Sequence, residues 1–399
     1  MTFATFFTPV RVALYLIGSV AAGLTAPVLL MPIVEAYRRL RLDPETAAGT
    51  TMYTSCQPCG MCSGAIARSG LGRVVYALSS EQLGSLGAAD MAEFTETQLA
   101  NLTGTQVRAL TTTATNALLE TQVAALTNTQ VQSLSTTALS GFDATQVGAM
   151  TTSQVRAITT AQIAALSTTD VQEFSTDQIA ALTVTQLGSF SSTKFAALTD
   201  AQVAAMTLTQ VQAISASNLS AMSLTQIAAL STTQLGAFGT DDIVALTTAQ
   251  AAALTSAQVA GLTTSQVASL TTSQVEALTT SQIQSLGSSQ IAAMSSSQIA
   301  AIQTADVASL TTAQVSGLTS GVIQSLSTAQ VVALGTTQVS AMGTAQLNAL
   351  SSAQVQAIET ADVAALTSAQ VSGLSTSAIA ALTSPQVNTL SSVQLQAMS

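Results

Sequence analysis

Three cysteines are the side chains of this sequence best suited to redox or metal chemistry. Cys56, Cys59 and Cys62 lie in one short segment and are the only cysteines of the chain. Their CxxCxxC spacing resembles part of an iron–sulfur ligand run, but a fourth thiolate is missing. We therefore interpret them as possible disulfide partners, within or between chains, with one thiol left over. A metal site is the alternative, and only if several chains share ligands.

Histidine and tryptophan are absent from the sequence. The Ser-His-Asp and Cys-His arrangements of hydrolases need an imidazole as general base, so neither is available. Metal sites that use histidine are excluded for the same reason. No cluster of titratable groups is apparent in the repeated part of the chain. We therefore predict no enzymatic activity, no catalytic, cofactor-binding or metal-binding residues, and no cofactor.

The elements that must position any functional residue are repeats of an octad phrase. The phrase runs from Ser79 to Met398 without insertion or deletion, and typical copies occupy 263–270 (TTSQVASL) and 271–278 (TTSQVEAL). About forty copies fit this stretch, and self-similarity at a fixed period is the signature of a repeat architecture. Each unit must then offer its neighbours the same face.

The phrase S/T-x-x-Q-V/I-x-A-L predicts one short helical turn per unit. Ser or Thr at position one and Gln at position four form a capping box, in which each side chain binds the other residue's backbone N–H. The apolar positions five and eight do not alternate as a strand requires. A continuous helix would not align them either, because one octad advances about 800°. We predict an all-α solenoid of about forty very short capped helical turns, with a β-solenoid as the alternative.

Positions within the phrase have different expected environments. Positions five and eight should fill the core, and the variable position six should face solvent. Position seven is nearly always small, which suggests close approach of a neighbouring backbone. Gly261, Gly317 and Gly373 occupy this position, each seven octads after the one before. A superhelical register or a recent duplication would explain this spacing, and we favour duplication.

The sequence divides into three parts. Residues 1–41 should form an apolar helix, 42–78 a linker that carries the cysteines, and 79–399 the solenoid. The stretch 12–34 follows Arg11, contains no charged residue and is long enough to cross a bilayer. It is interpreted as a membrane anchor, with a cleaved signal peptide or burial in an assembly as alternatives.

The charge distribution constrains the partners. Charged residues make up 7% of the chain, and the net charge is −10. The repeats have no basic stripe to displace counterions from a duplex, so nucleic acid is excluded as a partner. Their weakly charged Thr, Ser and Gln surface favours self-association. A membrane partner is possible through 12–34, and any surface ligand is unknown.

The repeated phrase, as at 159–166 and 271–278, resembles tandem octapeptide repeats of large bacterial secreted or cell-surface proteins. This resemblance implies an extended structural role and brings no catalytic residues. The predicted function is a non-enzymatic rod that self-assembles into filaments or projects from a cell or particle surface. The alternatives are an adhesin or fibre-like binding module and, less favoured, an ice-binding protein. The predicted location is the cell surface or the extracellular space.

Overall fold

The computed structural model describes residues 51–52, 73–74, 83, 87, 88, 91 and 94–398. The chain divides into two compact units, Met1–Ala205 and Met206–Ser399. Each unit is described by itself. The apolar helix expected within 1–41 and the cysteine cluster fall outside the described residues, so both stay predictions, as do the three domain boundaries.

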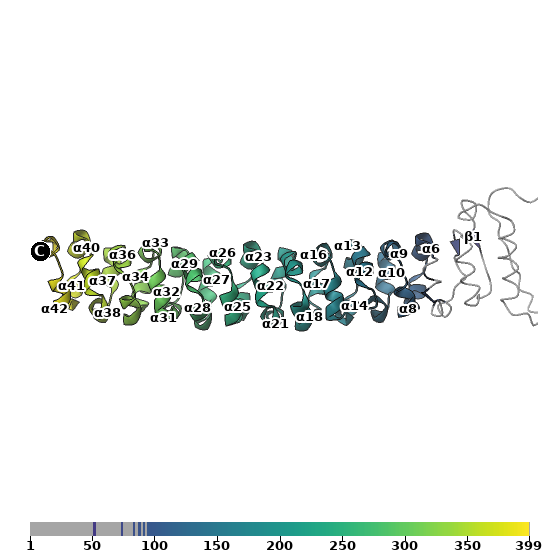
Figure 1. Cartoon of the computed structure of the whole chain (residues 1–399), viewed down its shortest axis with the longest axis horizontal. Helices are drawn as coiled ribbons and strands as arrows, with labels where there is room; N and C mark the ends of the chain where they lie inside the picture. The colour runs from purple at the N-terminus through teal and green to yellow at the C-terminus, as the bar shows by residue number, and fades with distance from the viewer. Residues whose placement is uncertain are drawn as a thin grey trace, which may run out of the picture. The chain divides into compact units, whose positions relative to one another are not determined.

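The described repeats of both units are built from helices of four to six residues, one for each octad (Figure 1). In the first unit the helices are α6 (Glu96–Ala100), α7 (Gly104–Arg108), α8 (Thr112–Thr115), α9 (Glu120–Ala125), α10 (Asn128–Ser133), α11 (Thr136–Leu139), α12 (Ala144–Ala149), α13 (Thr152–Ala157), α14 (Thr160–Ala165), α15 (Thr168–Glu173), α16 (Thr176–Ala181), α17 (Val184–Leu187), α18 (Ser192–Ala197) and α19 (Asp200–Ala204).

In the second unit the helices are α20 (Leu208–Gln212), α21 (Ala216–Ala221), α22 (Leu224–Ala229), α23 (Thr232–Gly236), α24 (Thr240–Ala245), α25 (Thr248–Ala253), α26 (Ser256–Ala260), α27 (Thr264–Ser269), α28 (Thr272–Ala277), α29 (Thr280–Ser285), α30 (Ser288–Ala292), α31 (Ser296–Ala301), α32 (Thr304–Ser309), α33 (Thr312–Ser316), α34 (Ser320–Ser325), α35 (Thr328–Val332), α36 (Thr336–Ser340), α37 (Thr344–Ala349), α38 (Ser352–Ala357), α39 (Thr360–Ala364), α40 (Ser368–Ser372), α41 (Thr376–Ala381), α42 (Ser384–Asn388) and α43 (Ser392–Ala397). Within 94–398 the structure contains no strand, so the all-α solenoid is confirmed there and the β-solenoid is wrong.

The predicted capping box starts most of these helices, and α28 illustrates it. The backbone N–H of Gln274 donates to the Thr271 hydroxyl over 3.1 Å, and the N–H of Thr271 donates to Oε1 of Gln274 over 2.8 Å. Leu278 then takes an extended conformation and ends the helix. Each octad thus carries its own start, and the next cap follows directly after the extended residue.

Substituted caps follow the same logic. Gly239, Gly287, Gly335 and Gly343 occupy the N-cap position, where glycine is accepted. Pro385 lies in the first turn of α42, where a missing N–H breaks no helical hydrogen bond.

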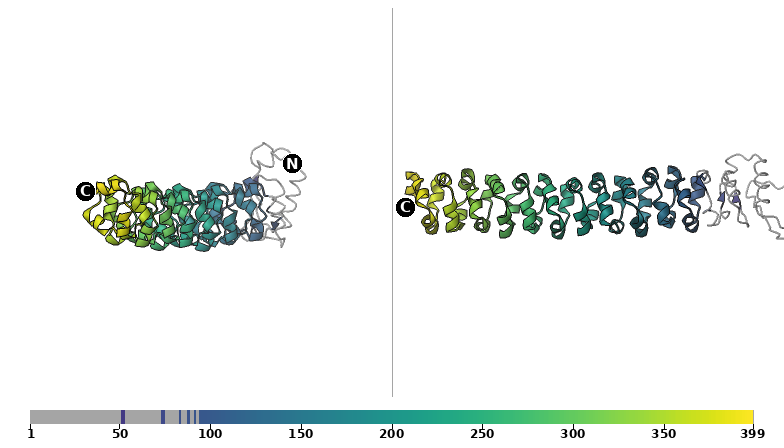
Figure 2. Two further views of the ribbon diagram at one scale, coloured as in Figure 1. Left: turned by 60° about the vertical axis from the view of Figure 1, so that its left-hand side comes forward. Right: turned by 60° about the horizontal axis from the view of Figure 1, so that its bottom comes forward.

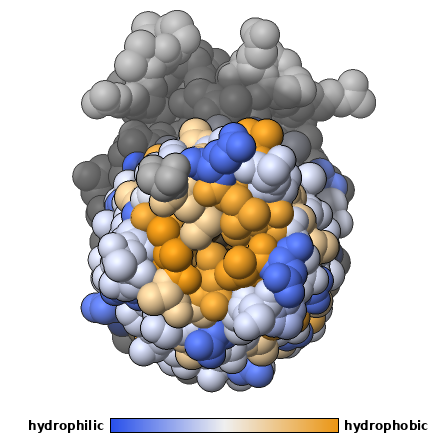
Figure 3. All heavy atoms as spheres, turned by 90° about the vertical axis from the view of Figure 1, so that its left-hand side faces the viewer, coloured by the Kyte–Doolittle hydropathy of each residue, from blue (hydrophilic) through white to orange (hydrophobic). Residues whose placement is uncertain are grey.

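The core of each unit is a central column of position-five and position-eight side chains. In α28 these are Val275, 1% exposed, and Leu278, 3% exposed, whereas Glu276 at position six is exposed. Figure 3 looks onto the C-terminal end of the second unit, where apolar residues gather at the centre and polar residues surround them. The expected inward and outward positions are therefore confirmed.

Helices three octads apart pack on one another within each unit (Figure 2). In the first unit α10 packs on α7 and on α13, and in the second α28 packs on α25 and on α31. One turn of the coil therefore takes at least three octads. Because one octad buries only two apolar side chains, worth about 1.5–3 kcal/mol each, a unit depends on such neighbours for its stability.

Small residues at position seven face a side chain rather than the expected neighbouring backbone. A Cβ added to Gly317 would overlap Cβ of Ser288, and one added to Gly373 would lie 2.5 Å from Cγ2 of Thr344. These partners stand at position two of an earlier octad. The contact explains why position seven is small, and it recurs at Gly141, which lies outside the seven-octad series. The favoured duplication is not tested by it.

Outside the repeats, β1 (Thr51–Met52) and β2 (Arg73–Val74) form a parallel pair, with Thr51 opposite Arg73. In the part of the chain that the structure describes, no helix combines the length and apolar character needed to cross a bilayer. The predicted anchor at 12–34 is outside that part.

Candidate functional site

Gln at position four joins each helical turn to an earlier one. Gln274 is 1% exposed, and its Nε2 donates to the carbonyl of Ile243 over 2.8 Å and to that of Leu246 over 2.7 Å. These acceptors lie 31 and 28 residues earlier, at positions five and eight of the octad four units before. The same side chain therefore caps its own helix through Oε1 and fastens it to the preceding turn through Nε2.

This arrangement recurs in both units, and we call it the glutamine ladder. In the first unit Gln162 donates to Val131 and Leu134, and in the second Gln330 donates to Ile299 and Ile302. The donor–acceptor distances are 2.7–2.9 Å in all four bonds. A buried amide with its donors and its acceptor satisfied avoids the cost of an unpaired polar group.

The ladder also limits how many octads make one turn of the coil. Its bonds join an octad to the fourth octad before it, whereas the helices that pack on one another lie three octads apart. A turn of the coil therefore takes between three and four octads.

A second, exposed set of hydrogen bonds runs in the opposite direction along the sequence. Nε2 of Gln284 donates to the carbonyl of Ser309 over 3.1 Å, and Nδ2 of Asn348 donates to that of Gly373 over 2.8 Å. The donors are position-six residues, and both acceptors lie in the third octad that follows. Position six is thus exposed, as expected, but some of its polar side chains also link turns.

Lys194 replaces Gln at position four of α18. Its Nζ donates to the carbonyls of Ile163 and Ala164 in the earlier turn. An ammonium group therefore substitutes for the amide as the donor. Burial lowers the pKa of Lys194, although the Asp170 carboxylate opposes this shift.

Asp170 replaces Gln at position four of α15 and keeps the cap. Oδ2 accepts from the backbone N–H of Ser167 over 2.8 Å and from the Ser140 hydroxyl in the earlier turn. Burial alone would raise the pKa of Asp170, but the hydrogen bonds from Ser140 and Ser167 outweigh it and lower the pKa. Burial raises the pKa of the nearby Glu173, as do the charges of Asp170 and Asp143.

Asp306 and Asp362 occupy the same position in α32 and α39 and are more deeply buried, at 5% and 3% exposure. Asp306 accepts from the Thr280 hydroxyl over 2.7 Å. Oδ2 of Asp362 is buried and has no hydrogen-bond partner in the structure. Burial, and then the charge of Glu359, raise the pKa of Asp362.

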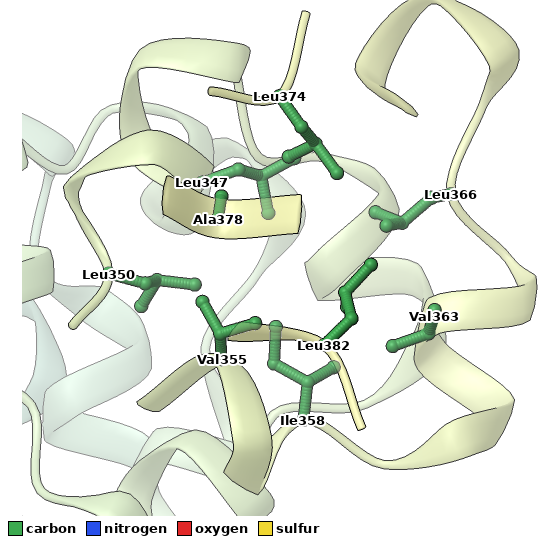
Figure 4. A pocket seen from close by; sticks show the side chains of 9 residues that line it. All are labelled: Leu347, Leu350, Val355, Ile358, Val363, Leu366, Leu374, Ala378 and Leu382. Atoms are coloured by element: carbon green, nitrogen blue, oxygen red, sulfur yellow. The ribbon is translucent and has the colours of Figure 1, made fainter. Parts of the chain in front are cut away.

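An apolar cavity lies near the C-terminal end of the second unit (Figure 4). Its lining consists of aliphatic side chains, and it therefore offers no group for catalysis or metal binding. These are Leu347, Leu350, Val355, Ile358, Val363, Leu366, Leu374, Ala378 and Leu382. Among the residues that the structure describes, no group of three or more His, Cys, Asp or Glu residues could hold a metal ion.

The predicted disulfide candidates, Cys56, Cys59 and Cys62, lie outside the described residues. The structure therefore does not show whether they come together. The polar residues that the structure does bring together are those of the glutamine ladder, which the sequence marked only as helix caps.

A family model described as "ALTTAQ repeat" matches residues 152–184, 235–272, 272–302, 299–336, 323–358 and 355–392. These matches support tandem repeats over that part of the chain. They do not test the bacterial surface context that the phrase resembles. No match was found among solved structures.

A second family model, "Cytidine and deoxycytidylate deaminase zinc-binding region", matches residues 30–78. A protein described as "Probable cytosine deaminase" from Schizosaccharomyces pombe is 58% identical over 33 residues, which are 8% of this chain and 20% of that protein. The chain thus spans about a fifth of that relative. These two findings contradict the prediction that the chain has no enzymatic character, which rested on the missing histidine and the repeats.

The signal for this match was present in the sequence. Pro58, Cys59 and Cys62 form a P-C-x-x-C run, which is the cysteine half of the deaminase zinc signature H-x-E…P-C-x-x-C. Our interpretation placed Cys56 on an equal footing with the other two cysteines and so compared the run with iron–sulfur ligands. The preceding proline distinguishes the two patterns.

The donor set for zinc is incomplete within this chain. Cys59 and Cys62 supply two thiolates, which suit zinc. The histidine of the signature has no counterpart, since the sequence contains none. The residues present do not fit the complete catalytic site, so no deamination step is derived.

Proposed function

We propose that the octad repeats act as a structural scaffold whose turns are fastened by the glutamine ladder. The observation that carries this proposal is the double use of each position-four Gln, as cap and as bond to the preceding turn. Each octad then adds a similar set of stabilising contacts, because the stability of a solenoid is a sum over neighbouring units. Each added octad therefore lengthens the scaffold and enlarges its surface, and it does so with the same hydrogen bonds and apolar contacts.

The surface of this scaffold supports a role in contact with other molecules. Positions one to three carry mostly Ser and Thr, and the surface has few charges that would repel another copy of the chain. We propose that copies of the chain associate, through 12–34 or through repeat faces. The resemblance to repeats of secreted and cell-surface proteins supports an extracellular location, with adhesion as the alternative role.

Deleting whole octads tests the scaffold. Removal of 263–318 takes out seven octads and preserves both the octad phrase and the spacing of the position-seven glycines. We expect a helical circular dichroism spectrum per residue unchanged from the full chain, with a proportionally smaller particle in small-angle X-ray scattering.

A deletion of 263–314, half an octad shorter, is the matched control. It breaks the octad phrase at the junction, so Gln side chains after it no longer meet their carbonyl acceptors. We expect lower thermal stability than in the seven-octad deletion. Equal stability of the two deletions would contradict the scaffold mechanism.

We also propose a second role, zinc binding by the segment 30–78. The P-C-x-x-C run at 58–62 and the two matches to deaminases support it. The missing ligand would be Cys56 or a residue of another chain, as in the shared-ligand alternative. Zinc content of the purified protein, compared with C59S, C62S and C56S, tests the proposal.

Release of ammonia from cytosine should be assayed on the same samples. Stoichiometric zinc that is lost in C59S and C62S would support the second role. Zinc-free protein whose thiols are oxidised to disulfides would contradict it and leave the disulfide interpretation. Neither result bears on the ladder, so the two proposed roles are tested independently.

A further inference from the structure

Two octads of the second unit provide a natural matched pair. Residues 303–310 (QTADVASL) and 359–366 (ETADVAAL) differ at two positions, the cap residue and position seven. Both place an aspartate at position four, where the ladder normally has Gln. The capping box is absent from both, because neither cap side chain accepts a hydrogen bond.

The first octad of the pair satisfies its polar groups. Oδ1 of Asp306 accepts from the Thr280 hydroxyl, and Nε2 of Gln303 donates to the carbonyl of Glu276 over 2.9 Å. The Ser309 hydroxyl donates to the carbonyl of Asp306 over 2.7 Å. Charge and hydrogen-bonding capacity are thus balanced around this buried carboxylate.

The second octad lacks each of these hydrogen bonds. Thr336 precedes Asp362 by 26 residues, as Thr280 precedes Asp306. The structure nevertheless shows no hydrogen bond from the Thr336 hydroxyl to Asp362. Glu359 replaces Gln303, and Ala365 replaces Ser309. Oδ2 of Asp362 is consequently buried without a donor, and a second carboxylate lies at the cap of the same short helix.

The turn that precedes α39 has an acceptor in the place that a ladder donor would reach. The register that pairs Gln274 with the carbonyl of Leu246 pairs Asp362 with that of Leu334. Among the described residues, no hydrogen bond to the Leu334 carbonyl is found. Asp362 cannot donate while ionised, whereas a protonated carboxyl group can.

We propose that Asp362 is a proton-operated joint of the repeat coil, in which the protonated carboxyl group donates to the Leu334 carbonyl as Gln does in the other turns. Acid closes this joint, and ionisation at neutral pH leaves α39 less firmly bound to the turn before it. Loss of a buried, unpaired charge drives the closure.

Apart from Glu359, no titratable group between 311 and 398 is available to perturb this joint. The helices packed against α39 are α36 and α42, and neither contains a charged residue. Between 311 and 398 the acidic residues are Glu359 and Asp362, and there is no Lys, Arg or His. Burial and Glu359 raise the pKa of Asp362, in agreement with the proposed proton uptake.

The direction of the pH effect follows from this shift. A carboxyl group whose pKa is raised in the folded state holds its proton to a higher pH there than in the unfolded chain. Its stabilising contribution is present below the unfolded pKa and is lost as the pH rises through the folded pKa. The joint should therefore weaken as the pH rises from acid toward neutrality.

Hydrogen exchange of the full-length chain, followed by mass spectrometry and corrected for intrinsic exchange rates, tests the proposal. Peptides covering 359–366 should gain protection as the pH falls, while peptides covering 303–310 should not. D362N should show the acid level of protection already at neutral pH and lose the pH dependence. E359Q should move the transition to lower pH, because it removes the neighbouring charge.

T336V and T280V distinguish the joint from a hydroxyl contact at Asp362. T280V should reduce protection of 303–310, and T336V should leave 359–366 unchanged. Equal pH dependence of the two octads, an unaltered D362N profile, or a loss of protection in T336V at neutral pH would each overturn the proposal.

Discussion

The two units use the same phrase but differ in the charges that it carries. The described repeats of the first unit include three basic residues, Arg108, Arg156 and Lys194, whereas the second unit has six acidic residues and no Lys, Arg or His. The three four-residue helices, α8, α11 and α17, all belong to the first unit. The phrase therefore tolerates a cation at the ladder position and shorter helices in one unit, and neither variation occurs in the other.

Lys194 shows what the ladder position requires. Its ammonium group reaches the carbonyls of the earlier turn, so donation to those carbonyls matters more than the shape of an amide. The second unit has no cation, and amides supply the donors of its ladder. It follows that loss of a Gln should be more damaging there than exchange of Lys194 for another donor in the first unit.

The largest expected effect is a charge in the core of the second unit. Val275→Asp places an unpaired carboxylate at a site that is 1% exposed, and should cost several kcal/mol of stability or force protonation of the new side chain. Thermal unfolding of the full chain, followed by circular dichroism, measures it. Glu276→Ala at the neighbouring exposed position is the control and should change little; similar losses for both variants would refute the inward face.

Removal of a ladder amide should give the second-largest loss of stability. Gln274→Ala removes a cap and leaves the Ile243 and Leu246 carbonyls without their donor, at a cost of about 2–4 kcal/mol. Gln284→Ala removes only an exposed bond to Ser309 and should cost about 0.5–1.5 kcal/mol. Denaturant titration of both variants compares them. If Gln274→Ala were no worse than Gln284→Ala, Gln would serve only as a cap.

Replacement by alanine should change stability in opposite directions at a position-seven glycine and at a glycine within a helix. Gly317→Ala drives a methyl group into Ser288 and should destabilise the second unit by about 1–3 kcal/mol. In α34, a Cβ added to Gly321 meets only the Thr319 hydroxyl oxygen, at 3.9 Å. Gly321→Ala should therefore stabilise the unit by about 0.5–1 kcal/mol. Shifts of the thermal midpoint in the same direction would remove the packing reason for a small residue at position seven.

The smallest effect is expected in the first unit. Because burial lowers the pKa of Lys194, the folded state binds fewer protons than the unfolded state between the two pKa values, and stability rises with pH there. Lys194→Gln should abolish this rise and change stability at neutral pH by about 1 kcal/mol or less. Lys194→Met, which cannot donate, should be the less stable variant. A rise in stability that persists in Lys194→Gln would place its cause elsewhere.

The helices were predictable from the sequence because their signals are local. Thr271 and Gln274 belong to one octad, and the capping box needs nothing beyond their spacing. The apolar pair at positions five and eight likewise identified the core. These inferences required no knowledge of how the turns stack.

The ladder and the deaminase-like segment were not predicted, for different reasons. The acceptors of the Gln274 amide lie four octads away, and their identity depends on the number of octads in a turn, which no local pattern gives. The orphaned Asp362 has the same origin. At Cys59 and Cys62, by contrast, the P-C-x-x-C signal was local but was compared with the wrong class of metal site.

The direction of the glutamine ladder has a consequence for synthesis of the protein. The ladder amides donate to carbonyls that precede them in the sequence, so a newly translated octad finds its acceptors already in place on the completed turns. A nascent chain can therefore fold one octad at a time as it leaves the ribosome, without waiting for residues still to be translated. Each finished turn then serves as the template on which the next is laid down.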